Sequence, residues 1–490
     1  MSSQLLPRAH DRAIGVAPEP VTPEPVTPAA PAPRNRAIAL FLILLAQLML
    51  TLDATVVNVA LPDIAVELNF TAAGLSWVLS GYTLAFGGLL LLGGRLGDVY
   101  GRRIFFMVGL GIFVASSLAG GLAVSPAMLI AARALQGIGA ALAAPSVLAL
   151  ITTTAVDEAA RNRGLAAFTA VSSGGAAIGL ILGGILTDLL DWRWTMFINV
   201  PIGIAVIALV PRFVGETARR HGRFDIVGAI AATGTAVSIV WTLLKAPDFG
   251  WGSIQTVSGF VVAAALLALL AWAETHHSHP LLRPALLQNR YRVAALVTMA
   301  ALYGGMLATF FLLVQFLEDD LGFSPLTAGL AFLPMPLSVF TMSRVTPRLV
   351  RRFGPARLVI TGAVGVTVAM VWLSQLSGTD GYPWAMPAMF AMGLSMGTAF
   401  MPISVIVLGG VEPEHAGSAS GLLQTMQQLG GSVGLAVVAS VYAAHQVTGD
   451  FLHGAHYGFV AAAVLAAIAL IAALTQVIRR RPPQGVLAVD

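Results

Sequence analysis

The sequence has 490 residues, of which 57% are hydrophobic and only 10% carry charge, and its mean hydropathy is +0.84. An average soluble domain carries about 25% charged residues, so this composition excludes a soluble globular protein. The net charge of +4 does not indicate nucleic-acid binding, because the basic residues are dispersed in short clusters. Without cysteine, neither a disulfide framework nor a cysteine-based metal site is available.

The first 36 residues form a Pro-rich segment, in which Pro-Glu-Pro-Val-Thr occurs at 18–22 and again at 23–27. Such a segment has little apolar surface to bury, so we predict a solvated tail with polyproline II character. It lacks the apolar core of a secretory signal, and the first span is expected to remain as an uncleaved anchor. Binding of a partner is the alternative to a simple tether.

Fourteen apolar segments fill the rest of the chain. About 20 apolar residues cross the roughly 30 Å hydrocarbon core as a helix, which satisfies every backbone polar group internally. We therefore expect an all-α membrane protein with fourteen spans. The predicted spans are 37–60, 74–94, 104–124, 127–152, 164–187, 194–211, 226–244, 254–273, 293–317, 325–345, 358–376, 384–408, 417–442 and 457–478.

Basic residues gather on one side of these spans. If the spans alternate in direction, all but three of the 27 Lys and Arg residues lie on the side of the N-terminus. The exceptions are Arg193 and Lys245 on the opposite side and Arg133 within a span. Because cytoplasmic loops retain Lys and Arg, both termini are predicted to be cytoplasmic.

An internal repeat divides the chain into halves. The segment 96–103 after the second span aligns with 349–356 after the tenth, and the glycine pair 174–175 aligns with 430–431. Related halves that meet at a central site are typical of alternating-access transporters. The predicted domains are a tail at 1–36, a six-helix bundle at 37–215, two extra helices with linkers at 216–292, a second six-helix bundle at 293–480 and a tail at 481–490.

The loop after the second span reads Gly-Arg-Leu-Gly-Asp-Val-Tyr-Gly-Arg-Arg at 94–103 and resembles the signature loop of the major facilitator superfamily. The glycines permit a tight turn, and the arginines mark the cytoplasmic edge. The resemblance implies a conformational latch between the two halves. Its residues are Gly94, Asp98, Gly101, Arg102 and Arg103. A plain turn that sets topology is the alternative.

Two charges lie well inside predicted spans, and both belong to further motifs. Asp53 stands in Leu-Asp-Ala-Thr-Val-Val-Asn at 52–58, which is similar to the first-helix motif of fourteen-span drug:proton antiporters. Arg133 opens a segment that resembles the fourth-helix motif of the same family. Both lie roughly 10–12 Å below the outer surface at 1.5 Å per residue. An ionisable residue at such depth is a functional candidate, and the pair is predicted to couple protons; a permanent ion pair that ties two helices is the alternative.

The fifth span has closely spaced glycines, with Gly-Gly-Ala-Ala-Ile-Gly-Leu-Ile-Leu-Gly-Gly at 174–184. This string resembles the motif that marks exporters rather than importers in the superfamily, although Leu180 stands where the family commonly has proline. The residues assigned to the exporter motif are Gly175, Gly179, Gly183 and Gly184. Close-spaced glycines let helices approach one another.

Polar side chains on other spans are assigned to a substrate cavity. In the fold implied by the resemblance, the first and fourth helices line the cavity, and the second half supplies polar residues on the ninth and thirteenth spans. The assigned residues are Thr55, Asn58, Gln136, Tyr303, Gln315, Gln424 and Gln428. Ordinary hydrogen bonds between helices are the alternative role for the glutamines.

These features predict a major facilitator fold of two six-helix bundles plus two extra helices. The predicted function is proton-driven export of hydrophobic or amphipathic small molecules by alternating access, from a bacterial cytoplasmic membrane. A proton-coupled nutrient importer and a flippase for lipids or lipid precursors are the alternatives. We expect a monomer that is not an enzyme, whose partners are its substrate, protons and membrane lipid and not nucleic acid. We expect no cofactor and no metal site, and the sequence contains no phosphate-binding Gly-rich loop.

Overall fold

The computed structural model describes residues 35–216, 226–276, 284–377, 381–411, 416–447 and 450–475. Within these ranges the chain is almost entirely helical, with one isolated bridge between Val447 and Asp450 and no strand. The predicted helical class is therefore confirmed. The two predicted tails lie almost wholly outside the described residues.

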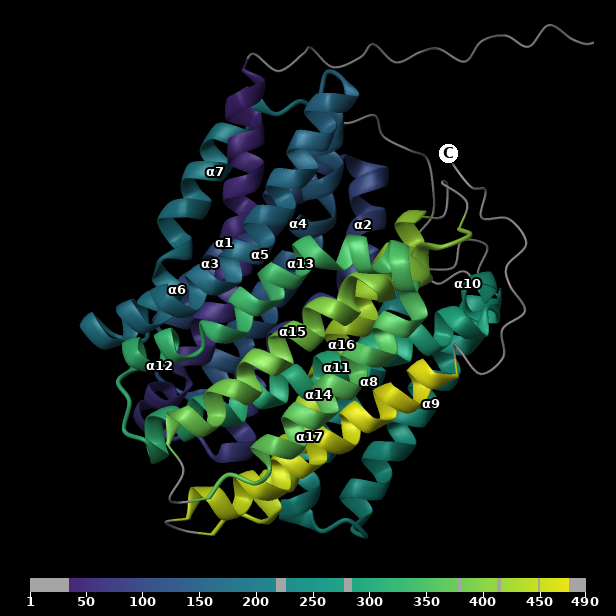
Figure 1. Cartoon of the computed structure of the whole chain (residues 1–490). Coiled ribbons are helices and arrows are strands. Elements are labelled where there is room, and N and C mark those ends of the chain that lie inside the picture. The colour runs from purple at the N-terminus through teal and green to yellow at the C-terminus, as the bar shows by residue number, and fades with distance from the viewer. Residues whose placement is uncertain are drawn as a thin grey trace, which may run out of the picture.

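The first group of helices runs from the start of the described chain to residue 213 (Figure 1). It consists of α1 (Arg36–Glu67), α2 (Ala72–Tyr100), α3 (Arg102–Gly121), α4 (Pro126–Thr154), α5 (Glu158–Leu189), α6 (Trp194–Phe197) and α7 (Asn199–Phe213). Next come α8 (Ile226–Phe249), α9 (Ile254–His276) and the short α10 (Pro284–Gln288).

The second group follows and completes the molecule. It consists of α11 (Arg290–Gln315), the π-helix η1 (Phe316–Asp320), α12 (Pro325–Ala331), α13 (Pro334–Phe353), α14 (Pro355–Leu373), α15 (Tyr382–Leu408), α16 (Ala416–Ala444) and α17 (Phe451–Leu474). Each of the fourteen predicted spans corresponds to one helix or to adjoining helices. By length and apolar composition of the described residues, however, only 11 helices qualify as spans, or 12 if the bent α5 is included. The number fourteen therefore stays a prediction.

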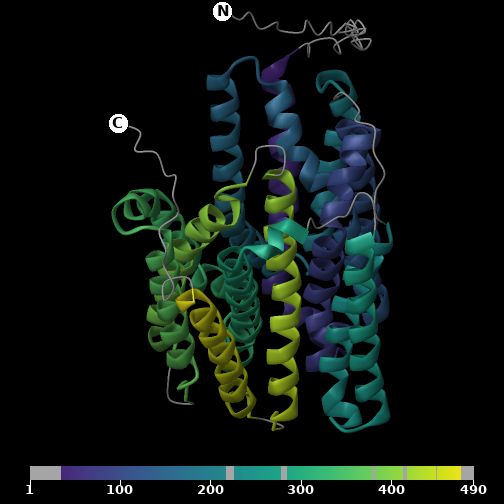
Figure 2. The same cartoon turned by 90° about the vertical axis from the view of Figure 1, so that its right-hand side faces the viewer.

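The helices pack mainly within their own group. Helix α4 packs on α2 and α3, and α1 on α5 and α7, whereas α11 packs on α16 and α17, and α14 on α15. The groups meet where α2 contacts α16, α5 contacts α12 and α1 contacts α11. Helix α8 lies against both α2 and α16, and α9 covers α8 at one edge of the molecule (Figure 2). The predicted domain boundaries agree in order with this grouping but stay a prediction.

The internal repeat has a common backbone geometry. Gly101 joins α2 to α3 with φ +117°, and Gly354 joins α13 to α14 with φ +78°. A side chain is disfavoured at such angles, so glycine is the residue that permits one helix to end and the next to begin without a loop. The alignment of 96–103 with 349–356 therefore matches two equivalent helix junctions.

Helices α11 and α16 cross at a contact made by glycines. A Cβ atom on Gly304 would lie 2.6 Å from the carbonyl oxygen of Gly430 and 3.0 Å from the Cα atom of Gly434. A side chain can relieve a close contact by changing its rotamer, but helix backbone atoms cannot. A larger residue at this position would therefore push the two helices apart.

Gly304→Ala is therefore expected to destabilise the protein by about 1–3 kcal/mol, because it overpacks this contact. Gly111→Ala on α3 is the matched control, since no atom lies within 4 Å of its would-be Cβ, and we expect a change within about 1 kcal/mol. Thermal unfolding of the purified protein in detergent checks the difference. Equal midpoints for the two variants would contradict the assigned close contact.

Candidate functional site

Asp53 lies at the centre of a buried polar network. The residue is 1% exposed, and its carboxylate oxygen Oδ2 is 2.6 Å from Nη1 of Arg133. The other oxygen, Oδ1, accepts hydrogen bonds from the side-chain amides of Gln136 at 3.0 Å and Asn199 at 2.8 Å. Three helices, α1, α4 and α7, therefore supply the carboxylate and its three donors. The predicted proximity of Asp53 and Arg133 is present in the structure.

Arg133 is held on several sides. Its Nε donates to the carbonyl oxygen of Val78 on α2 at 3.1 Å, and Nη1 donates to Oε1 of Gln136 at 3.0 Å. The guanidinium carbon lies 4.5 Å from the centroid of the Tyr82 ring, in the geometry of a cation–π contact. Gln136 in turn donates to Ser117 on α3 at 2.7 Å. Five helices thus surround one ion pair.

Asn199 is a member of the network that the sequence prediction did not assign. It is the first residue of α7 and follows the break at Ile198, where α6 ends. Its side-chain amide is 1% exposed and reaches Asp53 from the third side. The sequence did contain a signal for this role. Asn199 is a polar residue in an apolar span, roughly 8 Å from the outer end of that span and so near the depth of Asp53.

The network is closed to solvent in the present conformation. Both carboxylate oxygens are occupied, and Asp53, Arg133 and Gln136 are each no more than 1% exposed. Asp53 and Arg133 together are neutral as a pair, which lowers the cost of burying either charge. Burial of all three side chains therefore separates the carboxylate from solvent in this conformation.

The cavity residues predicted on the first half occupy different surroundings. Gln136 was assigned to the cavity, but it is fully buried and bonds Asp53 instead. Thr55 donates to carbonyl oxygens of its own helix and lies against Gly179. Asn58 also donates to its own helix, while its buried Oδ1 has no hydrogen-bond partner within the described chain. That orphaned acceptor is available to a ligand donor.

The cavity residues predicted on the second half are dispersed. Tyr303 on α11 makes a side-chain hydrogen bond with Gln427, and its ring lies 6.4 Å from that of Phe400. Gln315 is 7% exposed and donates to the carbonyl oxygen of Phe311 on its own helix. Gln424 is an exposed residue of α16. A shared cavity for all seven residues therefore stays a prediction.

Gln428 lies where the halves meet. Its Cβ atom lies 2.5 Å from the Cβ position of Gly87 on α2, and one turn further along α16 Ser432 forms a side-chain hydrogen bond with Thr83. Tyr82, beside Thr83, interacts electrostatically with Asp53, Arg133 and Tyr303. A continuous set of contacts therefore leads from the buried ion pair to the second half.

The exporter-motif glycines have two different neighbours. Gly175, Gly179 and Gly183 are spaced by four residues and face α1, where a Cβ on Gly183 would lie 2.6 Å from the carbonyl oxygen of Val56. Gly184 faces the other half, with its Cβ position 2.6 Å from the carbonyl oxygen of Pro325. One helix therefore contacts both the Asp53 helix and the opposite half through glycine.

The described contacts of the predicted latch lie within the first half. Arg102 donates to the carbonyl oxygen of Pro145 at 3.5 Å, and Nη1 of Arg103 donates to that of Val214 at 3.1 Å. Glu216 accepts from the backbone of Arg103 at 3.0 Å and limits the space at Gly101. The Cβ position of Gly94 is 3.5 Å from Pro145, and the side chain of Asp98 lies outside what the structure describes.

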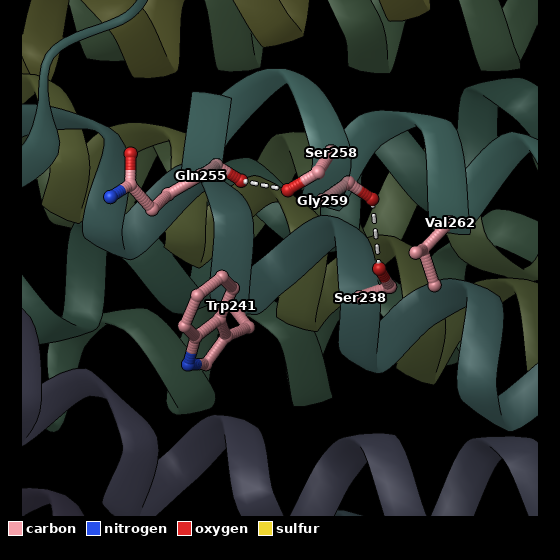
Figure 3. A pocket seen from close by; sticks show the side chains of 6 residues that line it. All are labelled: Ser238, Trp241, Gln255, Ser258, Gly259 and Val262. Atoms are coloured by element: carbon pink, nitrogen blue, oxygen red, sulfur yellow. Dashed lines mark hydrogen bonds between the residues drawn. The ribbon is translucent and has the colours of Figure 1, made fainter. Parts of the chain in front are cut away.

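A separate pocket of about 360 Å³ lies between α8 and α9 (Figure 3). Its lining residues are Ser238, Trp241, Gln255, Ser258, Gly259 and Val262. The hydroxyls of Ser238 and Ser258 donate to the carbonyl oxygens of Gly259 and Gln255, so helix backbone already satisfies them. None of these residues contacts the Asp53 network. Among the described residues, no group of three or more His, Asp or Glu could hold a metal ion.

The ion pair yields a test of stability. Arg133→Met is expected to destabilise the protein by about 3–5 kcal/mol, because it leaves the Asp53 carboxylate buried without a cation. Asp53→Asn combined with Arg133→Met removes that charge as well and should recover part of the loss. Thermal unfolding in detergent measures Arg133→Met, Asp53→Asn and the double variant. Two losses that simply add in the double variant would show that the residues do not interact as a pair.

Comparison with known proteins identifies the family. Residues 43–435 match the Major Facilitator Superfamily. The chain is 37% identical over 418 residues to puromycin resistance protein pur8 of Streptomyces alboniger, an alignment that covers 84% of this chain and 82% of that protein. It is 36% identical over 464 residues to the cephamycin export protein CmcT of Amycolatopsis lactamdurans, covering 92% and 95%. The lincomycin resistance protein of Streptomyces lincolnensis is 32% identical to this chain, and the alignment covers 94% of each protein.

Solved structures show the same fold at low sequence identity. Crystal structures of a peptide transporter POT in complex with sulfate and of the nucleoside transporter NupG superpose with TM-scores of 0.66 and 0.63 at 15% and 14% identity. The matches cover 89% and 90% of this chain, and 93% and 100% of those proteins. The chain belongs to the Major Facilitator Superfamily and is a membrane transporter rather than an enzyme.

Proposed function

We propose that this protein exports hydrophobic or amphipathic small molecules in exchange for protons. The observation that carries the proposal is the ion pair of Asp53 and Arg133, which is sealed inside the first half. The relatives named for puromycin resistance and cephamycin export support the direction of transport and the kind of cargo. The glycine string on α5 supports export over import.

The proposed coupling follows from the electrostatics of this network. In the described conformation the carboxylate attracts Arg133 and accepts two amide hydrogen bonds. Protonation would abolish the attraction and leave Arg133 as a buried, uncompensated cation, which is costly in a medium of low dielectric constant. The protonated state therefore favours a conformation in which the arginine gains another partner or water. A change of charge at Asp53 is thereby converted into a change of packing around α4.

Two routes transmit this change to the opposite half. Tyr82 lies under Arg133, and the next residue, Thr83, bonds Ser432 of the second half, so movement of the guanidinium bears on a contact between halves. Helix α5 packs through Gly179 on α1 and through Gly184 on α12. In the proposed cycle, Asp53 releases its proton inward as substrate binds, the halves rock, and the carboxylate is reprotonated from outside as substrate leaves. Each charge that moves down the membrane potential contributes about 2.3 kcal/mol per 100 mV.

Asp53→Asn is expected to abolish substrate-dependent proton movement, because an amide cannot carry the proton. The measurement uses a pH-sensitive dye inside proteoliposomes with an imposed pH gradient, with puromycin as the probe substrate. Asp248→Asn is the matched control, since this exposed residue lies at the end of α8 and pairs with Lys245, and it should retain coupling. Normal dissipation of the gradient by Asp53→Asn would refute the proton-site assignment. Uptake into energised inverted vesicles separates export from import.

Both termini are proposed to be cytoplasmic. The chain contains no cysteine, so one introduced cysteine reports one position. Gly252 lies in the turn between α8 and α9, with no atom near its Cβ position, and Gln288 is exposed at the end of α10.

In intact cells, a membrane-impermeant maleimide should label Gly252→Cys but not Gln288→Cys. After permeabilisation both should react, which controls for accessibility. The reverse pattern would invert the orientation, and labelling of both positions in intact cells would contradict alternating spans.

A further inference from the structure

Four arginines form one exposed face at the end of α13. This arginine stripe consists of Arg344, Arg348, Arg351 and Arg352. The four residues are spaced by four, three and one positions, and all are exposed. Residues at such spacings share one side of a helix. The stripe belongs to the second copy of the internal repeat and ends immediately before the Gly354 junction.

The opposite face of α13 packs on α15. The Cβ position of Gly393 lies 2.3 Å or less from atoms of α13 at Ser338 and Met335, and that of Gly397 lies 2.6 Å from Met342. Thr346 donates to the carbonyl oxygen of Gly397 at 3.1 Å. The core of the second half therefore lies on the side away from the arginine stripe, and the stripe faces outward.

The stripe has no anionic partner within the described chain. No ion pair or hydrogen bond joins any of its guanidiniums to another described residue. The contacts that are present are aromatic, with Arg344 4.7 Å from the ring centroid of Phe340 and Arg352 5.2 Å from that of Phe353. Four uncompensated cations within three turns repel one another, so an external anion would be bound favourably.

The position of the stripe along the helix indicates where that anion lies. Pro325–Phe353 comprises 29 residues, which corresponds to about 43 Å at 1.5 Å per residue. The hydrocarbon core is about 30 Å thick, so a span of this length exceeds it by roughly 13 Å in total. Arg344 stands about 13 Å before Phe353, and four charges inside hydrocarbon would be costly, so the surplus length is assigned to the end that carries the stripe.

We infer that the arginine stripe is a binding surface for the headgroups of anionic phospholipids. Guanidinium groups bind phosphate with paired hydrogen bonds, and basic clusters beside a membrane span attract anionic lipids. The ring of Phe340, 37% exposed, adjoins Arg344 on the membrane side of the stripe and contacts the acyl chains. With the proposed orientation, the lipid lies in the cytoplasmic leaflet. This site is separate from the Asp53 network and requires no proton coupling.

Native mass spectrometry of the full chain in detergent tests the inference, with phosphatidylglycerol and phosphatidylcholine as probes. We expect phosphatidylglycerol to bind in preference. Arg344→Gln with Arg348→Gln should weaken its binding about 25-fold, at about five-fold per arginine. Arg36→Gln with Arg212→Gln, two exposed arginines of the first half, removes the same charge and should change binding less than two-fold.

Three results would overturn the inference. Equal binding of the two lipids would exclude recognition of charge, and equal losses in the two double variants would reduce the effect to overall charge. Displacement of phosphatidylglycerol by an equal concentration of inorganic phosphate would identify a site for a soluble anion instead. Arg344→Lys with Arg348→Lys keeps the charge and should bind within about five-fold of the parent chain, which would show that the loss in the glutamine variant comes from the removed charge.

Discussion

The structure of the first half depends on one carboxylate and one guanidinium that are buried together. Either charge alone would cost several kcal/mol inside the protein, and the 2.6 Å contact of Asp53 and Arg133 offsets that cost for both. The amides of Gln136 and Asn199 both donate to the other carboxylate oxygen. Because the donors come from different helices, the charge state of Asp53 bears on how α1, α4 and α7 pack.

Small residues determine where the two halves can approach each other. Gly184 admits the backbone of α12, and Gly329 on α12 admits the carbonyl oxygen of Leu180 at 2.5 Å from its Cβ position. Contacts made by backbone atoms are close and relatively featureless, so α5 and α12 can separate and return without unpairing buried polar side chains at this contact. The contact suits the proposed rocking of the halves, whereas the Asp53 network lies within one half.

Helix α8 limits that motion on one side. It lies against α2 of the first half and α16 of the second, and Gly88 on α2 leaves room for the side chain of Thr233. A helix that touches both halves has to shift against at least one of them when they rock. Helix α9 lacks this constraint, because only 11% of its apolar window is buried, and it covers α8 alone.

The sequence by itself determined the helical class, the order of the helices and the two charges of the central pair. Hydropathy indicates spans because lipid cannot satisfy backbone polar groups, and a charge inside a span is conspicuous for the same reason. The glycine junctions were also predictable, since Gly101 and Gly354 occupy equivalent positions in the repeat and both have positive φ. These properties depend on residues close together in the chain.

Only the tertiary structure decided which side chains complete the network. Asn199 lies 146 residues from Asp53 along the chain, and its amide reaches the carboxylate because α7 packs against α1. Gln136 was assigned to a cavity because depth and polarity do not reveal the direction in which a side chain points. The rotation of each helix about its own axis is set by packing against its neighbours, and a single sequence does not specify that rotation locally.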